Sequence, residues 1–253
     1  KIVTRSSAPI DYFKFNENFF DKFRLLLKMS VYKFSDLIIS NSKKSAKKIF
    51  INLNSQPKVL AISNPLKNTQ NKISLKKKNY FLYVGRLSKE KGIYELINSF
   101  ELFYKLNQKY KLMIIGKGQE QNKLKNYIKE KKSKKNIFFL DWKKNLSNYY
   151  KYAKIFILPS YFEGFGNVLI EALSYGTPCI STKSDGPVEI LSNNRYGLII
   201  KNNNPKNICS AIEKVLKNYN LFTKKAKDGH ISNTKYDHRM IGQKYLNKLN
   251  GIL

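Results

Sequence analysis

From residue 80 onward the sequence alternates between short apolar runs and longer amphipathic stretches. The apolar runs cover 80–84, 111–115, 137–140, 155–158 and 178–181. The stretches with apolar residues at helical spacing cover 91–108, 119–132, 145–152, 167–175 and 205–218. Strands that alternate with helices predict βαβ units and a parallel, doubly wound α/β sheet. In such a sheet a ligand binds at the carboxyl ends of the strands.

The beginning of the chain shows the same alternation on a smaller scale. We expect strands at 2–4, 36–39 and 58–62 and helices at 19–34 and 43–50. The polar, lysine-rich segment that follows has the composition of an interdomain linker, and a last helical stretch covers about 238–249. The predicted division is a smaller unit over 1–66, a linker over 67–79, a larger domain over 80–230 and a C-terminal helical segment over 231–253.

Two carboxylates frame a glycine-rich turn after the run 155–158. The sequence there is Pro159-Ser160-Tyr161-Phe162-Glu163-Gly164-Phe165-Gly166-Asn167-Val168-Leu169-Ile170-Glu171-Ala172. Gly164 and Gly166 allow a ligand to approach the backbone closely, and the helix that begins there offers unpaired N–H groups at its positive dipole end. We therefore expect a phosphate at the N–H groups and sugar hydroxyls at Glu163 and Glu171.

Two cations follow the first strand of the larger domain. Arg86 comes directly after Gly85, and Lys91 begins the next helical stretch. Together they can clamp a diphosphate and neutralise its charge. Arg86 is one of only five arginines, which favours a function for it, whereas Lys91 alone would be an ordinary surface cation.

The seven residues between Glu163 and Glu171 resemble the signature of the retaining glycosyltransferases of family 4, which have the GT-B fold and use nucleotide-sugar donors. The segment 81–92 resembles the donor-diphosphate segment of that family, and 176–191 resembles the strand and loop that follow. GT-B enzymes have two Rossmann-like domains. The resemblance implies that 80–230 is a complete donor domain and that 1–66 is the last part of an acceptor domain, so that the chain is N-terminally truncated.

The resemblance also implies a role for each residue of the motif. Glu171 would bind the ribose hydroxyls, and Glu163 would contact the donor sugar and stabilise positive charge at its anomeric carbon. Glu163, Arg86 and Lys91 are the expected catalytic residues. The full donor-binding set is Gly85, Arg86, Lys91, Glu163, Gly164, Phe165, Gly166, Asn167, Val168 and Glu171. Asn167 is explained equally well as a helix N-cap.

At two places the sequence departs from the family pattern. Arg5 and Ser6 follow a short strand where many relatives carry an active-site histidine, so either could contact the sugar or the acceptor. Asp141-Trp142 stands where many relatives have glycine and an apolar residue near the base. Trp142 could stack on a base, but a single tryptophan is more often part of the core.

Two other short motifs are expected to be turns. Gly116-Lys117-Gly118 lacks the third glycine of a dinucleotide fingerprint. The segment 184–187 contains Asp, Gly and Pro, which favour turns.

Charge and cysteine content limit the function classes. Lys and Arg total 48 against 17 acidic residues, a net charge of +31. The lysines are dispersed, which fits a solvated surface or a compositional bias as well as it fits an anionic partner. An anionic membrane would be the favoured partner, at about 1 kcal/mol per lysine. Nucleic acid is the less favoured one, because arginine clusters are missing.

Cys179 and Cys209 fit buried thiols of a reducing compartment.

We therefore predict a cytoplasmic retaining glycosyltransferase, of hexosyl or N-acetylhexosaminyl type, that can also lie on the inner face of the cell membrane. It would transfer a sugar from a nucleoside-diphosphate sugar, with UDP as the expected nucleotide, to a saccharide or lipid-linked acceptor in polysaccharide, lipopolysaccharide or glycan biosynthesis. No cofactor and no metal are expected, because the basic clamp makes Mg²⁺ unnecessary. The alternative is another GT-B enzyme, a nucleotide-sugar epimerase or a sugar-phosphate synthase.

Overall fold

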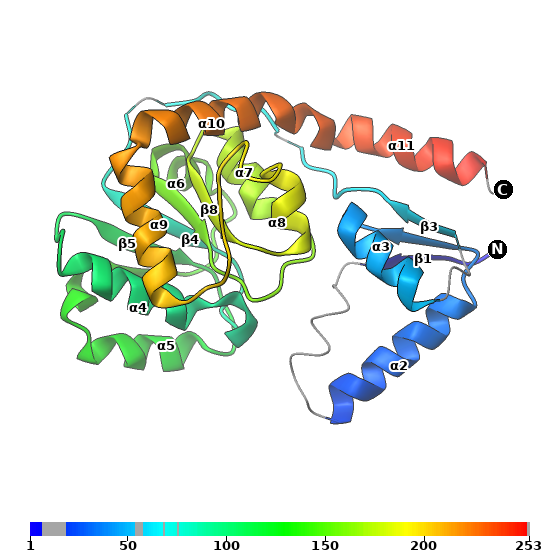
Figure 1. Cartoon of the computed structure of the whole chain (residues 1–253), viewed down its shortest axis with the longest axis horizontal. Coiled ribbons are helices and arrows are strands. Elements are labelled where there is room, and N and C mark those ends of the chain that lie inside the picture. Colours follow the sequence, from blue (N-terminus) through cyan, green and yellow to red (C-terminus); the bar gives the residue numbers. More distant parts are fainter. Residues whose placement is uncertain (7–18, 54–57, 68, 75, 252–253) are drawn as a thin grey trace.

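The computed structural model describes residues 1–6, 19–53, 58–67, 69–74 and 76–251. These residues form a larger and a smaller parallel α/β unit (Figure 1). The predicted α/β class is therefore confirmed. None of the helices in these ranges is long and apolar enough to cross a membrane.

In the described part of the chain, the larger unit is a six-stranded parallel sheet with the order β6-β5-β4-β7-β8-β9. Its strands are β4 (Tyr80–Val84), β5 (Lys111–Ile115), β6 (Ile137–Leu140), β7 (Ile155–Leu158), β8 (Cys179–Thr182) and β9 (Leu198–Ile200). The strand order reverses between β4 and β7, which makes this pair the topological switch point of a doubly wound sheet. The sequence predicts every strand except β9, whose three residues are too few for a periodic signal.

Helices cover both faces of this sheet, which explains why all of β4 is buried. Phe81 and Tyr83 pack on the face covered by α4 (Ile93–Tyr104), α5 (Gln121–Tyr127) and α9 (Pro205–Lys217). Tyr80, Leu82 and Val84 pack on the opposite face. That face is covered by α6 (Ser147–Tyr152), α7 (Asn167–Ser174), α8 (Asp185–Ile190) and α10 (Tyr219–Ser232).

The helices differ from the predictions in four places. The stretch 91–108 is a short 3₁₀ turn (Lys89–Lys91) and then α4, separated by Gly92 in the left-handed conformation. In the stretch 119–132 the α-helix covers only α5, and the chain then continues in 3₁₀ turns at Ile128–Glu130 and Lys132–Asn136. The segment 184–187 is not a turn, because α8 begins at Asp185 and its first helical turn tolerates a proline. Helix α10 is an additional helix that the apolar pattern does not predict.

In the smaller unit, the described residues form a parallel sheet of β1 (Val3–Ser6), β2 (Leu37–Ser40) and β3 (Lys58–Ala61), in that order. Helices α2 (Phe19–Lys33) and α3 (Lys43–Asn52) share a core on one face through Tyr32, Ile38, Ile49 and Leu53. Ser42 caps α3 as predicted, because its side chain accepts a hydrogen bond from the Ser45 N–H at 3.2 Å.

The other face of this small sheet is covered by the end of the chain. Helix α11 (His238–Asn250) places Ile241 against Leu37, Ile39 and Ile62. The returning chain pairs with the outgoing one, since the Leu66 N–H donates to the Tyr236 carbonyl at 3.0 Å and the His238 N–H donates to the Leu66 carbonyl at 3.0 Å. Figure 1 shows α10 and α11 following one another along the top of both units. The domain boundaries at residues 66, 80 and 230 stay predictions.

Candidate functional site

A cavity of about 360 Å³ opens where β4 and β7 end, at the topological switch point. Both units contribute to its wall. Its lining residues are Asn41, Asn64, Tyr83, Val84, Gly85, Arg86, Lys91, Trp142, Leu158, Glu163, Phe165, Gly166, Asn167 and Val168. This is the edge at which a doubly wound sheet binds its ligand.

The loop after β4 forms the first wall of this cavity. The hydroxyl of Tyr83 donates a hydrogen bond to the Arg86 carbonyl at 2.9 Å and thereby fixes the turn that presents Gly85 and Arg86. Tyr83 is fully buried, and this burial, reinforced by the charges of Glu163 and Glu90, raises the pKa of its hydroxyl well above the usual value. The side chain stays protonated and can act as a permanent donor to that turn.

The motif Gly116-Lys117-Gly118 supports this first wall from behind. The Gly85 N–H donates to the Ile115 carbonyl at 3.0 Å, and the Leu87 N–H donates to the Lys117 carbonyl at 2.9 Å. A Cβ on Gly116 would lie 1.9 Å from the Gly85 oxygen, and one on Gly118 would lie 2.2 Å from the Leu87 oxygen. The two glycines are therefore needed for close approach of two backbone segments, which agrees with the structural interpretation of this motif.

The turn before α7 forms the second wall. Gly166 adopts the left-handed conformation (φ 92°) and occupies the N-cap position, with no side chain capping the helix. The N-cap prediction for Asn167 is therefore wrong, because the helix begins at Asn167 itself. Its side-chain oxygen instead accepts a hydrogen bond from the Asn64 amide at 3.0 Å. Without a capping side chain, the first N–H groups of α7 remain available to an anion.

Lys91 and Glu163 form an ion pair across the cavity, with 2.8 Å between Nζ and Oε2. Both side chains are mostly buried. Each therefore restricts the position of the other, and a ligand here meets a cation and a carboxylate side by side. This arrangement suits a molecule that carries both phosphate and hydroxyl groups.

Glu171 lies outside this cavity. It lines an adjoining cavity of about 620 Å³, and Trp142 lines both. The Tyr150 hydroxyl donates a hydrogen bond to Glu171 Oε2 at 2.7 Å. Burial raises the pKa of the Glu171 carboxyl, and this hydrogen bond lowers it in part. The two carboxylates of the motif thus face two neighbouring compartments.

Trp142 is 59% exposed, so its assignment to the core is wrong. It stands where the two cavities meet, which leaves its ring accessible to a base. Gly164 is buried and lines neither of these two cavities.

Arg5 and Ser6 do not line either cavity. Ser6 is buried. Arg5 donates to the side-chain oxygen of Asn64 at 2.7 Å, and its guanidinium lies 5.7 Å from the centre of the Tyr245 ring of α11. Because Asn64 also donates to Asn167, Arg5 reaches the site indirectly. Sequence reasoning missed Asn41 and Asn64, whose only signal is their position shortly after the strands β2 and β3 of the smaller unit.

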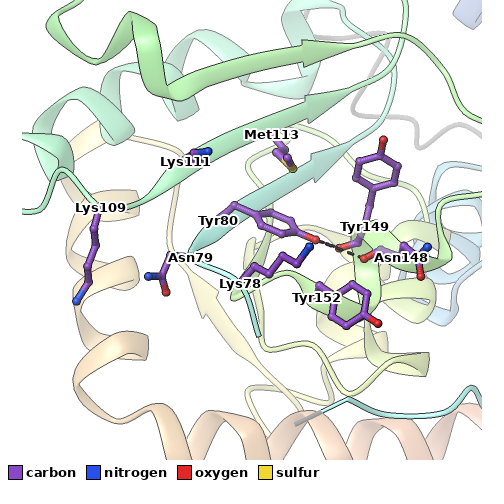
Figure 2. Close-up of a pocket in the computed structure, with 9 residues that line it drawn as sticks. All are labelled: Lys78, Asn79, Tyr80, Lys109, Lys111, Met113, Asn148, Tyr149 and Tyr152. Atoms are coloured by element: carbon purple, nitrogen blue, oxygen red, sulfur yellow. Dashed lines mark hydrogen bonds between the residues drawn. The ribbon is translucent and has the colours of Figure 1, made fainter. Parts of the chain in front are cut away.

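Another cavity, of about 520 Å³, lies at the opposite edge of the large sheet (Figure 2). Lys78, Lys109 and Lys111 line it near the amino ends of β4 and β5. The Tyr80 hydroxyl there donates to the Tyr149 carbonyl at 2.6 Å. This edge is not where doubly wound sheets bind ligands. The switch-point cavity is therefore the better candidate. Within the described ranges, no cluster of three or more His, Cys, Asp or Glu side chains is arranged to hold a metal ion.

Comparison with known proteins agrees with this location. Residues 67–230 match the family model described as glycosyl transferases group 1. The chain is 32% identical over 200 residues to an uncharacterised glycosyltransferase of Methanocaldococcus jannaschii. The matched region is 72% of the chain and 48% of that protein. It is 31% identical over 231 residues to the N-acetylgalactosamine-N,N'-diacetylbacillosaminyl-diphospho-undecaprenol 4-alpha-N-acetylgalactosaminyltransferase of Campylobacter jejuni, which covers 87% of the chain and 61% of that protein.

Solved structures show the same fold. HepE of Anabaena, crystallised with UDP-glucose, superposes with a TM-score of 0.87 at 17% identity, over 98% of this chain and 72% of that one. The sucrose-phosphate synthase of Thermosynechococcus elongatus superposes with a TM-score of 0.84 at 19% identity, over 98% and 68%. The chain spans about half the length of the relatives that it matches in sequence.

Proposed function

The chain belongs to the group 1 glycosyl transferases and has their GT-B fold, and from this premise we propose that it transfers a sugar from a nucleoside-diphosphate sugar to a hydroxyl group. UDP is the proposed nucleotide, since structural neighbours were crystallised with UDP and UDP-glucose. The observation that supports the proposal best is the Lys91–Glu163 pair in the switch-point cavity. It sets a cation for a phosphate beside a carboxylate for sugar hydroxyls.

In this proposal the donor occupies the two adjoining cavities. Arg86, Lys91 and the first N–H groups of α7 hold the diphosphate. Glu163 contacts the sugar. Glu171, held by Tyr150, binds the ribose in the second cavity, and Trp142 lies beside the base. A donor that bends around Trp142 would account for the separation of the two carboxylates.

We propose transfer with retention. The bond between the anomeric carbon and the diphosphate oxygen breaks, the acceptor oxygen bonds to that carbon from the same face, and its proton goes to the departing diphosphate. Arg86, Lys91 and the helix N-terminus stabilise the charge that develops on the leaving group. Glu163 is partly neutralised by Lys91, which suits a stabiliser of positive charge and not a covalent nucleophile. With two cations at the diphosphate, the proposal includes no metal and no cofactor.

The acceptor is proposed to be a saccharide or a lipid-linked saccharide of surface polysaccharide, lipopolysaccharide or glycan biosynthesis. The name of the Campylobacter jejuni relative includes a diphospho-undecaprenol substrate and N-acetylgalactosaminyl transfer, which supports a hexosyl or N-acetylhexosaminyl donor. Cys179 and Cys209 are buried free thiols, which suits the reducing cytoplasm.

Peripheral contact with the inner face of an anionic membrane is also proposed, and helix α2 supports it. Exposed apolar side chains follow one side of this helix, at Phe20, Phe23, Leu27 and Val31. Basic residues flank them. An interfacial helix combines these two features.

A sugar-phosphate synthase is the second candidate, because the chain is also 30% identical over 169 residues to a probable sucrose-phosphate synthase of Thermosipho melanesiensis. The remaining alternatives are an epimerase of nucleotide sugars and a nucleic-acid-binding protein. Product analysis without any acceptor separates an epimerase from a transferase, and an RNA-binding assay across a salt series tests the charge-driven alternative.

A thermal-shift screen of UDP-, GDP- and ADP-sugars tests the proposal directly, because ligand binding stabilises the folded state. We expect one nucleotide class to raise Tm in the wild-type protein and to do so less in Glu163→Ala and Arg86→Ala. Equal stabilisation of all three proteins would remove the assignment of this site.

A further inference from the structure

A third cavity touches the donor cavity from the side of the smaller unit. It encloses about 230 Å³ and lies between α3, the turn before α7 and the loop that joins β8 to α8. Glu163 lines both this cavity and the donor cavity. Its other lining residues are Lys44, Lys48, Tyr161, Phe162, Lys183, Ser184, Asp185 and Val188. A molecule here would adjoin any group that Glu163 contacts in the donor cavity.

The carboxylates around this cavity already have cationic or hydrogen-bonding partners. Asp185 accepts from Lys48 Nζ at 3.0 Å and from the Ser45 hydroxyl at 3.2 Å. Glu189 of α8 accepts from the Lys43 N–H at 2.8 Å. Glu163 is paired with Lys91. These contacts fix α8 against α3 and leave no carboxylate of the cavity for its remaining lysines.

Those remaining lysines are Lys44 and Lys183. Both residues are exposed and line the cavity, and among the described residues neither side chain has an ion-pair partner. Ser184 Oγ is buried there and has no hydrogen-bond partner within the part of the chain that the structure describes. A buried hydroxyl without a protein partner is free to hydrogen-bond a water molecule or a group that is bound in the cavity.

We propose that this cavity binds the acceptor, and that the acceptor carries an anionic group close to the hydroxyl that attacks the anomeric carbon of the donor sugar. This inference rests on the proposed function, because it uses Glu163 as the place where donor and acceptor meet. Lys44 and Lys183 bind the anion, and Ser184 supplies a hydrogen bond. Tyr161, whose hydroxyl is fixed by Glu95 at 2.7 Å, offers an aromatic face beside them.

The size of the cavity limits how far the anion can be from the reacting hydroxyl. Its volume is equivalent to about eight water molecules at about 30 Å³ each. A group that is bound in so small a cavity lies close to Glu163, which lines both this cavity and the donor cavity. The anion is therefore a phosphate or a carboxylate on the acceptor sugar itself, and not a charge farther along a polymer.

The test measures binding of simple anions and a neutral sugar while the donor site is occupied. Glucose 1-phosphate, glucuronate and glucose are titrated by calorimetry into the protein saturated with UDP, or with GDP or ADP if one of these binds instead. The test variant is Lys44→Gln/Lys183→Gln. The matched control is Lys47→Gln/Lys217→Gln, which removes the same charge from exposed positions on α3 and α9 that line none of the cavities described here.

We expect at least one anion to bind at least about tenfold more tightly than glucose, and the test variant to lose most of this preference while the control keeps it. Binding of glucose 1-phosphate alone identifies a phosphate site, and equal binding of glucuronate identifies a carboxylate site as well. Equal affinities for the anions and glucose, or an unchanged test variant, would overturn the proposal. Loss of anion binding in the test variant without any nucleotide binding would support the anion site and contradict the proposed function instead.

Discussion

Helices α4 and α2 are both crossover helices between parallel strands, but they are buried very differently. In α4 the apolar residues Leu96, Ile97, Phe100 and Phe103 all lie in one core. In α2 the residues Leu25, Met29 and Tyr32 pack against the small sheet, while Phe23 and Leu27 are half-exposed. The same strand-helix pattern thus produces a self-contained core in the larger unit and a helix with a second apolar side in the smaller one.

The two sides of α2 are opposite to each other. At about 100° per residue, positions 20, 23, 27 and 31 are centred roughly 160° from the packed positions 25, 29 and 32. All four of these outward residues are apolar and exposed. A helix that only covers a sheet needs one apolar side. The second side therefore indicates a contact outside the described fold, for which we propose an anionic membrane.

The largest difference between the two helices is expected in folding stability. Phe100→Ala empties a fully buried site and should reduce the free energy of unfolding by about 3–5 kcal/mol. Phe23→Ala replaces a side chain that is 50% exposed and should change it by only about 0.5 kcal/mol. Urea unfolding of both variants measures this. A comparable loss for Phe23→Ala would mean that α2 is part of a larger core.

The two arginines at strand ends give the next largest contrast. Arg86 lines the donor cavity, and Arg86→Ala should lower kcat/KM for sugar transfer by about 10²–10³. Arg5 acts only through Asn64, so Arg5→Ala should lower it by no more than about tenfold. Steady-state kinetics of transfer, or of donor hydrolysis, measures both values. Equal losses would show that Arg5 touches the substrate.

The sequence predicted the fold of the larger unit better than it predicted which residues meet at the site, and the reason is physical. Buried strands such as β4 and β7 can be predicted from their continuous apolar runs. Their parallel arrangement places Gly85, Arg86 and Glu163 at one edge of the sheet. Local patterns do not encode which segments meet across units. Asn64 and Asn41 therefore escaped prediction, and the separation of Glu171 from Glu163 by Trp142 depends on the path of α7 and the 141–146 loop.

Short elements are the other limit. The three residues of β9 and the six of α8 carry too little periodicity to predict. A proline and a glycine at the start of α8 also match a turn as well as a helix. Asn167 was misassigned for a related reason, since glycine takes the N-cap position whenever the backbone there must be left-handed.

The outward side of α2 can be tested with vesicles. Phe23→Ser/Leu27→Ser/Val31→Ser removes apolar area that would otherwise insert between lipids, and should weaken binding to anionic vesicles by at least about tenfold. The control Leu106→Ser/Leu221→Ser/Ile231→Ser changes apolar residues of the larger unit that are at least as exposed, and should leave binding unchanged. Sedimentation with anionic and with zwitterionic vesicles measures this. If the α2 variant binds as tightly as the control, the contact lies elsewhere, and a change in its oligomeric state would indicate a second copy of the chain.

The smallest expected effect comes from two half-buried lysines, one in α2 and one beside the larger unit. Burial lowers the pKa of Lys28 in α2 to about 8, and burial lowers the pKa of Lys77, beside the larger unit, to about 8. Lys77 Nζ donates to the Lys151 carbonyl at 2.8 Å and to the Thr177 hydroxyl at 3.0 Å. In the unfolded chain both amines keep an ordinary pKa near 10.5. Between about pH 8 and 10.5 the unfolded state therefore binds more protons, and stability rises with pH.

Each lysine should contribute less than about 1 kcal/mol per pH unit in that window, because both remain partly solvated. Urea unfolding at several pH values up to 9.5 measures the slope, with Lys76→Gln as an exposed control. We expect Lys28→Gln and Lys77→Gln each to reduce the slope of stability against pH. Both effects should appear in one unfolding transition, because α11 and the pairing of Leu66 with Tyr236 and His238 join the two units. If the Lys28 effect instead appears in a separate, earlier transition, the smaller unit unfolds independently of the larger one.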